Sequence, residues 1–65
     1  MNETHTIVFH TDEDYKEALS LIDMLKPDRC DDEGIEMFWD DEAKRDTAVE
    51  DLKEMLGISV DTFTL

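Results

Sequence analysis

Residues 28–34 contain side chains that could bind a divalent cation, because three consecutive acids precede a glycine there. An EF-hand loop has oxygen ligands at its positions 1, 3 and 5 and a glycine at position 6. Aligning Gly34 with that glycine puts Arg29 at position 1 and Glu36 where an apolar residue is expected. The flanking segments also have the composition of strands rather than of a helix pair. We therefore predict a solvated acidic loop without a dedicated metal site.

The histidines and the cysteine offer no catalytic arrangement. His5 and His10 are an odd number of residues apart on one expected strand, so they point to opposite faces and cannot share a metal ion. Cys30 stands among acids that oppose thiolate formation, and no histidine is near it in the sequence. Gly34 and Gly57 each stand alone, which excludes a phosphate-binding glycine motif. The expectation is a protein that is not an enzyme, with no catalytic residue and no cofactor.

The acidic side chains dominate the chemistry of the chain. Nineteen Asp and Glu against six Lys and Arg give a net charge of −13 over 65 residues. This charge disfavours binding to nucleic acid or to anionic membranes and favours basic partners. Three acidic groups are the candidate partner-binding residues. They are Asp31, Asp32 and Glu33 in the loop, Asp40, Asp41 and Glu42 at a helix start, and Asp46, Glu50 and Glu54 along that helix.

The last group has i, i+4 spacing, which places its carboxylates on one helix face about 5–6 Å apart at Cβ. Such a row of anions resembles a nucleic-acid backbone, and a groove of Arg and Lys that holds phosphates would accept it. The pattern therefore favours a DNA mimic. Three alternatives stay open: a face kept charged for solubility, a domain adapted to concentrated salt, and an interaction module that uses apolar residues and forms a homodimer.

The first forty residues should form two strands with a helix between them. Residues 4–10 alternate β-branched and aromatic side chains, which is typical of a strand. Thr11 is a suitable N-cap for a helix from about residue 12, and Pro27 ends that helix. Residues 35–39 again have the composition of a strand. The apolar positions of the helix recur at spacings of three and four and predict a buried stripe of Tyr15, Ala18, Leu19, Ile22 and Leu25.

A second helix and a third strand complete the pattern. Asp40 or Asp41 is expected to cap the helix, and Gly57 suits the left-handed position that follows it. Residues 58–65 read as the last strand. The order β-α-β-α-β predicts one α/β (α+β) domain over residues 1–65, with a three-stranded sheet and two helices on one face. The apolar positions of the second helix are Ala48, Val49, Leu52, Met55 and Leu56.

Two helices can cover only one face of such a sheet. The face that they cover is expected to hold Ile7, Phe9, Ile35, Met37, Trp39, Phe63 and Leu65. The opposite face would then hold Val8, Phe38 and Val60. Scattered exposed apolar residues are ordinary on small proteins, and this is the favoured interpretation; the alternative is a strip that binds a partner or a second copy. We expect a monomer or a weak dimer.

The location of the protein is predicted from the start of the chain and from its cysteine content. An acid at Glu3 stands where a secretory signal carries a base, and the apolar run 7–9 is too short for a signal or a membrane span. A single cysteine excludes an internal disulfide. These features predict a protein of the reducing cytoplasm.

In its length, its acidity, its lack of a catalytic motif and its compact α/β pattern, the chain resembles the small anti-CRISPR proteins of phages and mobile elements, particularly those that act as DNA mimics. The resemblance covers the whole chain and is one of composition, so no site residue is carried over from it. It implies an inhibitor in the bacterial cytoplasm that binds the basic DNA-recognition surface of a CRISPR effector. A type I Cascade complex, with its PAM-reading subunit, is the first choice of target.

Overall fold

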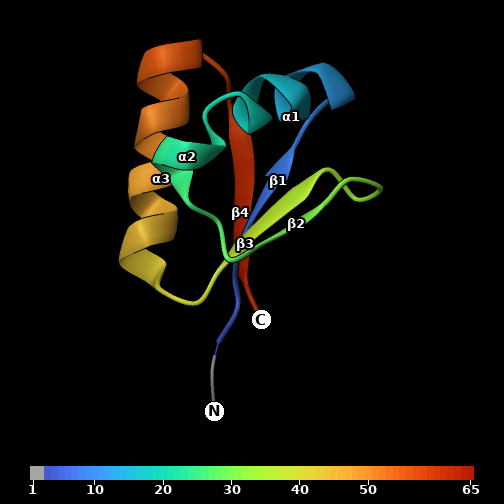
Figure 1. The fold of residues 1–65 in the computed structure, drawn as a ribbon. Coiled ribbons are helices and arrows are strands. Elements are labelled where there is room, and N and C mark those ends of the chain that lie inside the picture. Colours follow the sequence, from blue (N-terminus) through green and yellow to red (C-terminus); the bar gives the residue numbers. More distant parts are fainter. Residues whose placement is uncertain (1–2) are drawn as a thin grey trace.

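The computed structural model describes residues 3–65, which form three helices and one four-stranded sheet (Figure 1). The predicted mixture of helices and strands is confirmed, whereas the predicted number of strands is wrong. The elements in chain order are β1 (His5–Phe9), α1 (Asp12–Leu19), α2 (Ile22–Leu25), β2 (Arg29–Asp31), β3 (Glu36–Trp39), α3 (Glu42–Leu56) and β4 (Val60–Thr64).

All neighbouring strands in the sheet are antiparallel, and their order is β2-β3-β1-β4. Because β3 and β4 both run opposite to β1, they are parallel to each other, and α3 is the crossover that joins them. The β1–β4 ladder runs from Phe9 opposite Val60 to His5 opposite Thr64. Beyond it, Thr4 and Leu65 exchange backbone hydrogen bonds of 3.1 and 2.9 Å.

Strand β2 was not expected, because residues 28–34 were predicted to be a polar loop. It forms a hairpin with β3 in which Cys30 lies opposite Met37. Its sequence, Arg-Cys-Asp, has no strand propensity, so the pairing with β3 determines its conformation rather than local preference. Short length and charged residues are typical of an edge strand that resists pairing with other chains.

The predicted first helix is divided in two. Thr11 caps α1 as expected, accepting a 3.1 Å hydrogen bond from the backbone N–H of Asp14. The helix breaks at residues 20–21, and α2 ends at Leu25, followed by the C-cap Lys26, which has a left-handed backbone with φ of 50°. This break changes the buried stripe: Leu21 packs on the core, whereas Ile22 is 38% exposed and was wrongly predicted to be buried.

Helix α3 begins and ends where the local signals predict. The Asp41 side chain caps it by accepting a 2.9 Å hydrogen bond from the N–H of Ala43, and Gly57 takes the left-handed position with φ of 66°. Its buried side does not include Met55, which is 58% exposed, contrary to expectation. Arg45 occupies that side instead and is only 7% exposed. Its position three residues before Ala48 places it on the buried face of the helix.

The core lies between the helices and one face of the sheet. Trp39 is fully buried at its centre, and its indole N–H donates a 3.0 Å hydrogen bond to the carbonyl oxygen of Leu25 at the end of α2. Helix α3 packs against β1 and β3, while α1 packs against β1. The buried hydrophobic residues are Ile7, Phe9, Tyr15, Ala18, Leu25, Met37, Trp39, Ala48 and Leu52.

The predicted faces of the sheet are correct for β1 and β3 but reversed for β4. Val60 pairs with Phe9 and packs against the core, whereas Phe63 pairs with Thr6 and belongs to the opposite face. Leu65, opposite Thr4, is 76% exposed. Side chains alternate along a strand, so a register that differs by one residue exchanges every side chain between the two faces.

Candidate partner-binding surfaces

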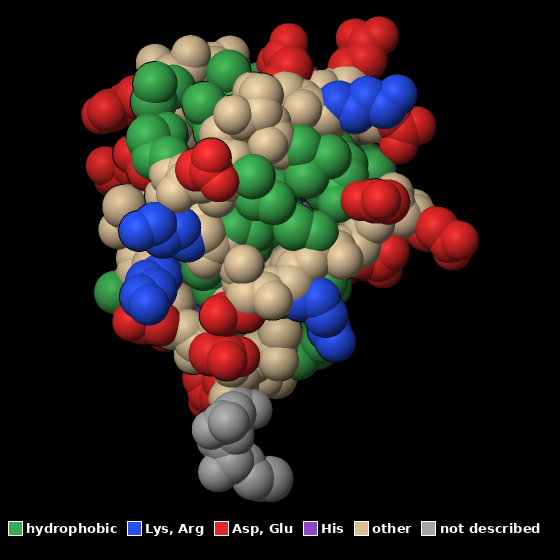
Figure 2. Space-filling model, viewed as in Figure 1, with side chains coloured by type: hydrophobic (Ala, Val, Ile, Leu, Met, Phe, Trp, Pro, Cys, Tyr) green, Lys and Arg blue, Asp and Glu red, His purple; other side chains and the backbone are tan. Residues whose placement is uncertain are grey.

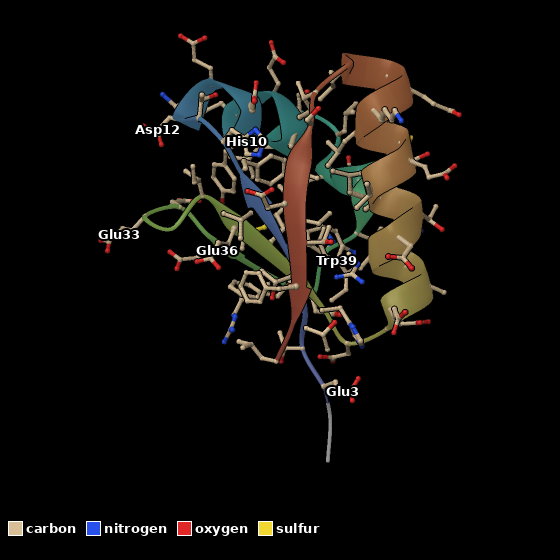
Figure 3. All side chains as sticks on the ribbon, turned by 180° about the vertical axis from the view of Figure 1, so that it is seen from behind. Glu3, His10, Asp12, Glu33, Glu36 and Trp39 are labelled. Carbon is tan, nitrogen blue, oxygen red and sulfur yellow. The ribbon has the colours of Figure 1, made fainter. Side chains whose placement is uncertain are left out.

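The nine acidic residues singled out from the sequence do not form one surface. The loop group, Asp31 to Glu33, precedes β3, and the group from Asp40 to Glu42 follows it. A four-residue strand at about 3.3 Å per residue separates the two groups by roughly 13 Å. In Figure 3 the labelled residue Glu33 lies in the turn beyond the start of β3, whereas Trp39 lies at the other end of this strand.

Two of the three carboxylates in the loop group, which lies in the β2–β3 hairpin, stabilise the local structure. Asp31 Oδ1 accepts hydrogen bonds from the backbone N–H groups of Glu33 and Gly34, at 3.1 and 3.2 Å, and so fixes the turn. Asp32 Oδ1 accepts a 2.5 Å hydrogen bond from the Tyr15 hydroxyl, which ties the hairpin to α1. Glu33 is exposed and points away from the molecule (Figure 3). The hairpin therefore presents its charge from a fixed backbone.

The side chains of Tyr15 and Cys30 stay protonated at neutral pH. Burial raises the pKa of the Tyr15 hydroxyl well above its ordinary value, and the hydrogen bond to Asp32 raises it further. Burial likewise raises the pKa of the Cys30 thiol; the Tyr15 hydroxyl beside it acts in the opposite direction, and the Asp32 charge adds to the rise. A thiol held in its protonated form is a poor nucleophile.

Further acids lie at the hairpin end of the molecule. Figure 3 places Asp12, at the start of α1, on the same side as Glu33 and Glu36, away from α3. The first turn of α1 carries Asp12, Glu13 and Asp14. The Tyr15–Asp32 hydrogen bond holds this turn next to the hairpin. This grouping depends on a contact between residues 17 positions apart, so the sequence alone could not show it.

The second acidic surface is the outer side of α3. Asp46, Glu50 and Glu54 are all exposed, as the i, i+4 spacing predicts. Successive members of this row are about 6 Å apart along the helix axis, so the row spans about 12 Å from Asp46 to Glu54. Asp46 accepts a 2.8 Å hydrogen bond from Arg45 Nε while remaining 58% exposed.

The acids around the start of α3 have different roles. Asp41 is the helix cap, and the backbone N–H of Asp40 donates a 2.8 Å hydrogen bond to Asp28 Oδ2. Glu42 is exposed in the first turn, where the helix dipole favours a carboxylate. The exposed side chains of Asp40 and Glu42 can thus contact a partner without loss of the cap.

Few of these charges are neutralised. Three ion pairs are present within residues 3–65: Glu3 with His5, Asp61 with His10, and Asp46 with Arg45. The two histidine pairs carry opposite charges only when the histidine is protonated. In the view of Figure 2, acidic side chains surround the molecule, and hydrophobic side chains gather between α1 and the β2–β3 hairpin. The negative charge is therefore displayed at the surface.

Several open hollows lie on the surface, and no ligand set for a metal converges in the part of the chain that is described. A groove of about 260 Å³ lies between α2 and α3, with Leu25 and Ala48 in its lining and Lys44 and Asp51 among the charged residues there. A larger hollow, of about 540 Å³, lies beside the β2–β3 hairpin, and its lining includes Arg29, Asp31, Asp32 and Glu33. Its volume is within the 300–1,000 Å³ usual for ligand pockets, but its lining is charged, whereas ligand pockets are lined mainly by apolar side chains. Within residues 3–65, no helix is long and apolar enough to cross a membrane.

The face of the sheet opposite the helices is open, and no helix crosses the strands in the view of Figure 3. The register aligns its side chains in two rows across the strands. The first row consists of Arg29, Phe38, Thr6 and Phe63, and the second consists of Asp31, Glu36, Val8 and Asp61. Val8 and Phe38 lie on this face as predicted, but Phe63 takes the place that was expected for Val60.

No family model, curated protein or solved structure matches the chain. Its function is therefore inferred from its own surface chemistry.

Proposed function

We propose that the chain is a DNA mimic that inhibits a CRISPR effector complex by occupying its basic DNA-binding surface. The observation that carries this proposal is the density of charge. A net charge of −13 along a longest dimension of 33 Å corresponds to about one negative charge per 2.5 Å. Duplex DNA carries one per about 1.7 Å of helix axis. Neither residue 1 nor residue 2 has an ionisable side chain, so the charge belongs to the described residues.

The fold holds these charges in fixed positions. Helix α3 is capped at both ends, and the hairpin turn is closed by the Asp31 carboxylate. Little conformational entropy is then lost when a partner binds, and preorganisation of this kind raises affinity. A groove lined by Arg and Lys would attract the protein from a distance and would release counterions on binding.

The test is competition with DNA on a purified type I effector complex, measured at several salt concentrations. We expect the protein to displace target DNA at low salt and to lose affinity steeply as salt rises, since charge pairs at the contact are screened. Association that leaves DNA binding unchanged would contradict the proposal. Absence of association with any effector would also contradict it and would leave salt adaptation as the better explanation of the charge.

Two triple variants with equal charge change identify which acidic surface binds. One neutralises α3 through Glu42→Gln, Glu50→Gln and Glu54→Gln, and the other neutralises the hairpin end through Asp12→Asn, Glu33→Gln and Glu36→Gln. Both leave the caps Thr11 and Asp41 and the turn residue Asp31 intact, so both should fold. If the protein mimics DNA, at least one of the two triple variants must bind the effector complex more weakly and with a smaller dependence on salt. Full retention of both properties by both variants would refute it.

A further inference from the structure

We propose that the open face of the sheet is the docking surface and that it receives an arginine-bearing segment of the basic partner, with one arginine stacked on Phe63. This inference rests on the proposed function and specifies its contact. The face combines aromatic side chains, carboxylates and a buried hydroxyl in two adjacent rows.

The register places charge and aromatic surface within reach of one arginine. Phe63 lies two residues from Asp61 on β4, and both face the open side. Two residues of strand span about 7 Å. Glu36 lies across Val8 from Asp61, which puts a second carboxylate in the same row. A guanidinium stacked on the Phe63 ring would therefore have carboxylates beside it.

The chain itself shows this mode of contact. The guanidinium carbon of Arg29 lies 4.5 Å from the centroid of the Phe38 ring, a cation–π arrangement on the same face. Phe63 occupies the same row on the other side of Thr6 and is 39% exposed. A partner arginine on Phe63 would repeat the geometry that Arg29 already adopts on Phe38.

Thr6 supplies an independent indication. It lies between Phe38 and Phe63 and is fully buried, and its hydroxyl oxygen has no hydrogen-bond partner among the described residues. A buried hydroxyl without a partner is costly, and nearly all such groups in folded proteins are hydrogen-bonded. Because this oxygen is buried, the side chains around it must move aside before a guanidinium N–H that enters beside the Phe63 ring can donate to it.

Charge decides between the possible occupants of this face. A second copy would bring its own Asp31, Glu36 and Asp61 to the contact, and each copy carries a net charge of −13. Like charges placed together at an interface oppose association. An arginine of the partner pairs with the carboxylates, stacks on the aromatic ring and donates a hydrogen bond to the hydroxyl. Lysine has a compact, strongly hydrated charge and stacks on aromatic rings less well.

The experiment compares two labelled probes, an arginine nonapeptide and a lysine nonapeptide, by fluorescence anisotropy with the full chain. The variants are Phe63→Leu and Thr6→Val, and Met55→Leu on α3 is the matched control for an exposed apolar residue. We expect the arginine probe to bind more tightly than the lysine probe, and Phe63→Leu to weaken it by about five-fold. Lysine-probe binding should stay unchanged in that variant. Thr6→Val should weaken the arginine probe alone, and Met55→Leu should affect neither probe.

Amide chemical-shift mapping with the arginine probe locates the contact. Shifts on β1, β3 and β4 support the proposal, and shifts confined to α3 or to the hairpin turn overturn it. Equal affinity for both probes, or no effect of Phe63→Leu, also overturns it.

A concentration-dependent dimer that Phe63→Leu dissociates would assign the face to a second copy. If Phe63→Leu still displaces DNA from the effector like the parent chain, this inference fails while the proposed function stands. Failure of the parent chain to displace DNA refutes the proposed function instead.

Discussion

Replacing the buried Arg45 with Met should lower the free energy of unfolding by about 2 kcal/mol. Arg45 is 7% exposed, and its Nη1 donates to the carbonyl oxygens of Thr6 at 3.4 Å and Phe63 at 3.3 Å. Its Nε donates to Asp46 at 2.8 Å. One side chain of α3 is thus bonded to both strands of the β1–β4 ladder.

The magnitude follows from these three contacts. A hydrogen bond to a charged group contributes about 1.5–3 kcal/mol, but the two carbonyl contacts are longer than the usual 2.9–3.0 Å, so each is worth roughly 1 kcal/mol. The pair with Asp46 adds roughly 0.5 kcal/mol, because Asp46 is largely exposed. Met keeps most of the apolar packing of the arginine stem, which offsets part of the loss. Some buried ion pairs can be replaced by apolar residues without loss of stability. Here the variant also deletes a positive charge from a chain with a net charge of −13, which increases the repulsion within the folded protein.

Urea unfolding followed by the fluorescence of Trp39 measures this change, since Trp39 is the only tryptophan and is fully buried. With a slope of about 1 kcal/mol per M for a domain of this size, the midpoint should fall by about 2 M. The control is Asp46→Asn, which should change stability by less than about 0.5 kcal/mol. A midpoint for Arg45→Met within about 0.5 M of the parent chain, or an equal loss for Asp46→Asn, would refute the assignment of the stability to the strand contacts.

Two further predictions concern backbone conformation and pH. Gly57→Ala should lower the free energy of unfolding by about 1 kcal/mol, because Gly57 has φ of 66° and the added Cβ meets no atom within 4 Å that could compensate by packing. The same urea titration measures this change. Because burial raises the pKa of Tyr15 and of Cys30 in the folded state, the unfolded chain releases these protons first, so the contribution of these two groups to stability is constant below about pH 8 and falls as pH rises above about 9. The double variant Tyr15→Phe, Cys30→Ala should flatten that alkaline decline in urea midpoints measured from pH 7 to 10.5, and an unchanged decline would contradict the assignment.

Features that depend on neighbours in the sequence could be predicted. The alternation in residues 4–10 identified β1, and the caps Thr11 and Gly57 mark helix ends through short-range hydrogen bonds and backbone preference. The exposed row on α3 was equally local, because i, i+4 spacing sets its face without reference to the rest of the fold.

Features that depend on the pairing of strands or on contacts between distant residues could not be predicted from the sequence. Strand β2 exists because Cys30 lies opposite Met37, and the open face contains Phe63 because Val60 pairs with Phe9. The spacing to Ala48 places Arg45 on the buried face of α3, but the carbonyl groups that accept its hydrogen bonds are 39 and 18 residues away and could not be read from the sequence. For the same reason the sequence identified the acidic groups but not their division between α3 and the hairpin end.

The pairing of the two ends of the described chain has a kinetic consequence. Strand β1 is central in the sheet, yet one of its two neighbours, β4, includes Thr64, whose hydroxyl lies 3.1 Å from the ring of His5 across a separation of 59 residues. Contacts between residues so far apart require closure of a long loop, which slows folding. During synthesis, β1 and the β2–β3 hairpin emerge first, and β1 keeps one unpaired edge until residues 60–64 have left the ribosome. Completion of the sheet, and with it of the open face, therefore requires residues 60–64.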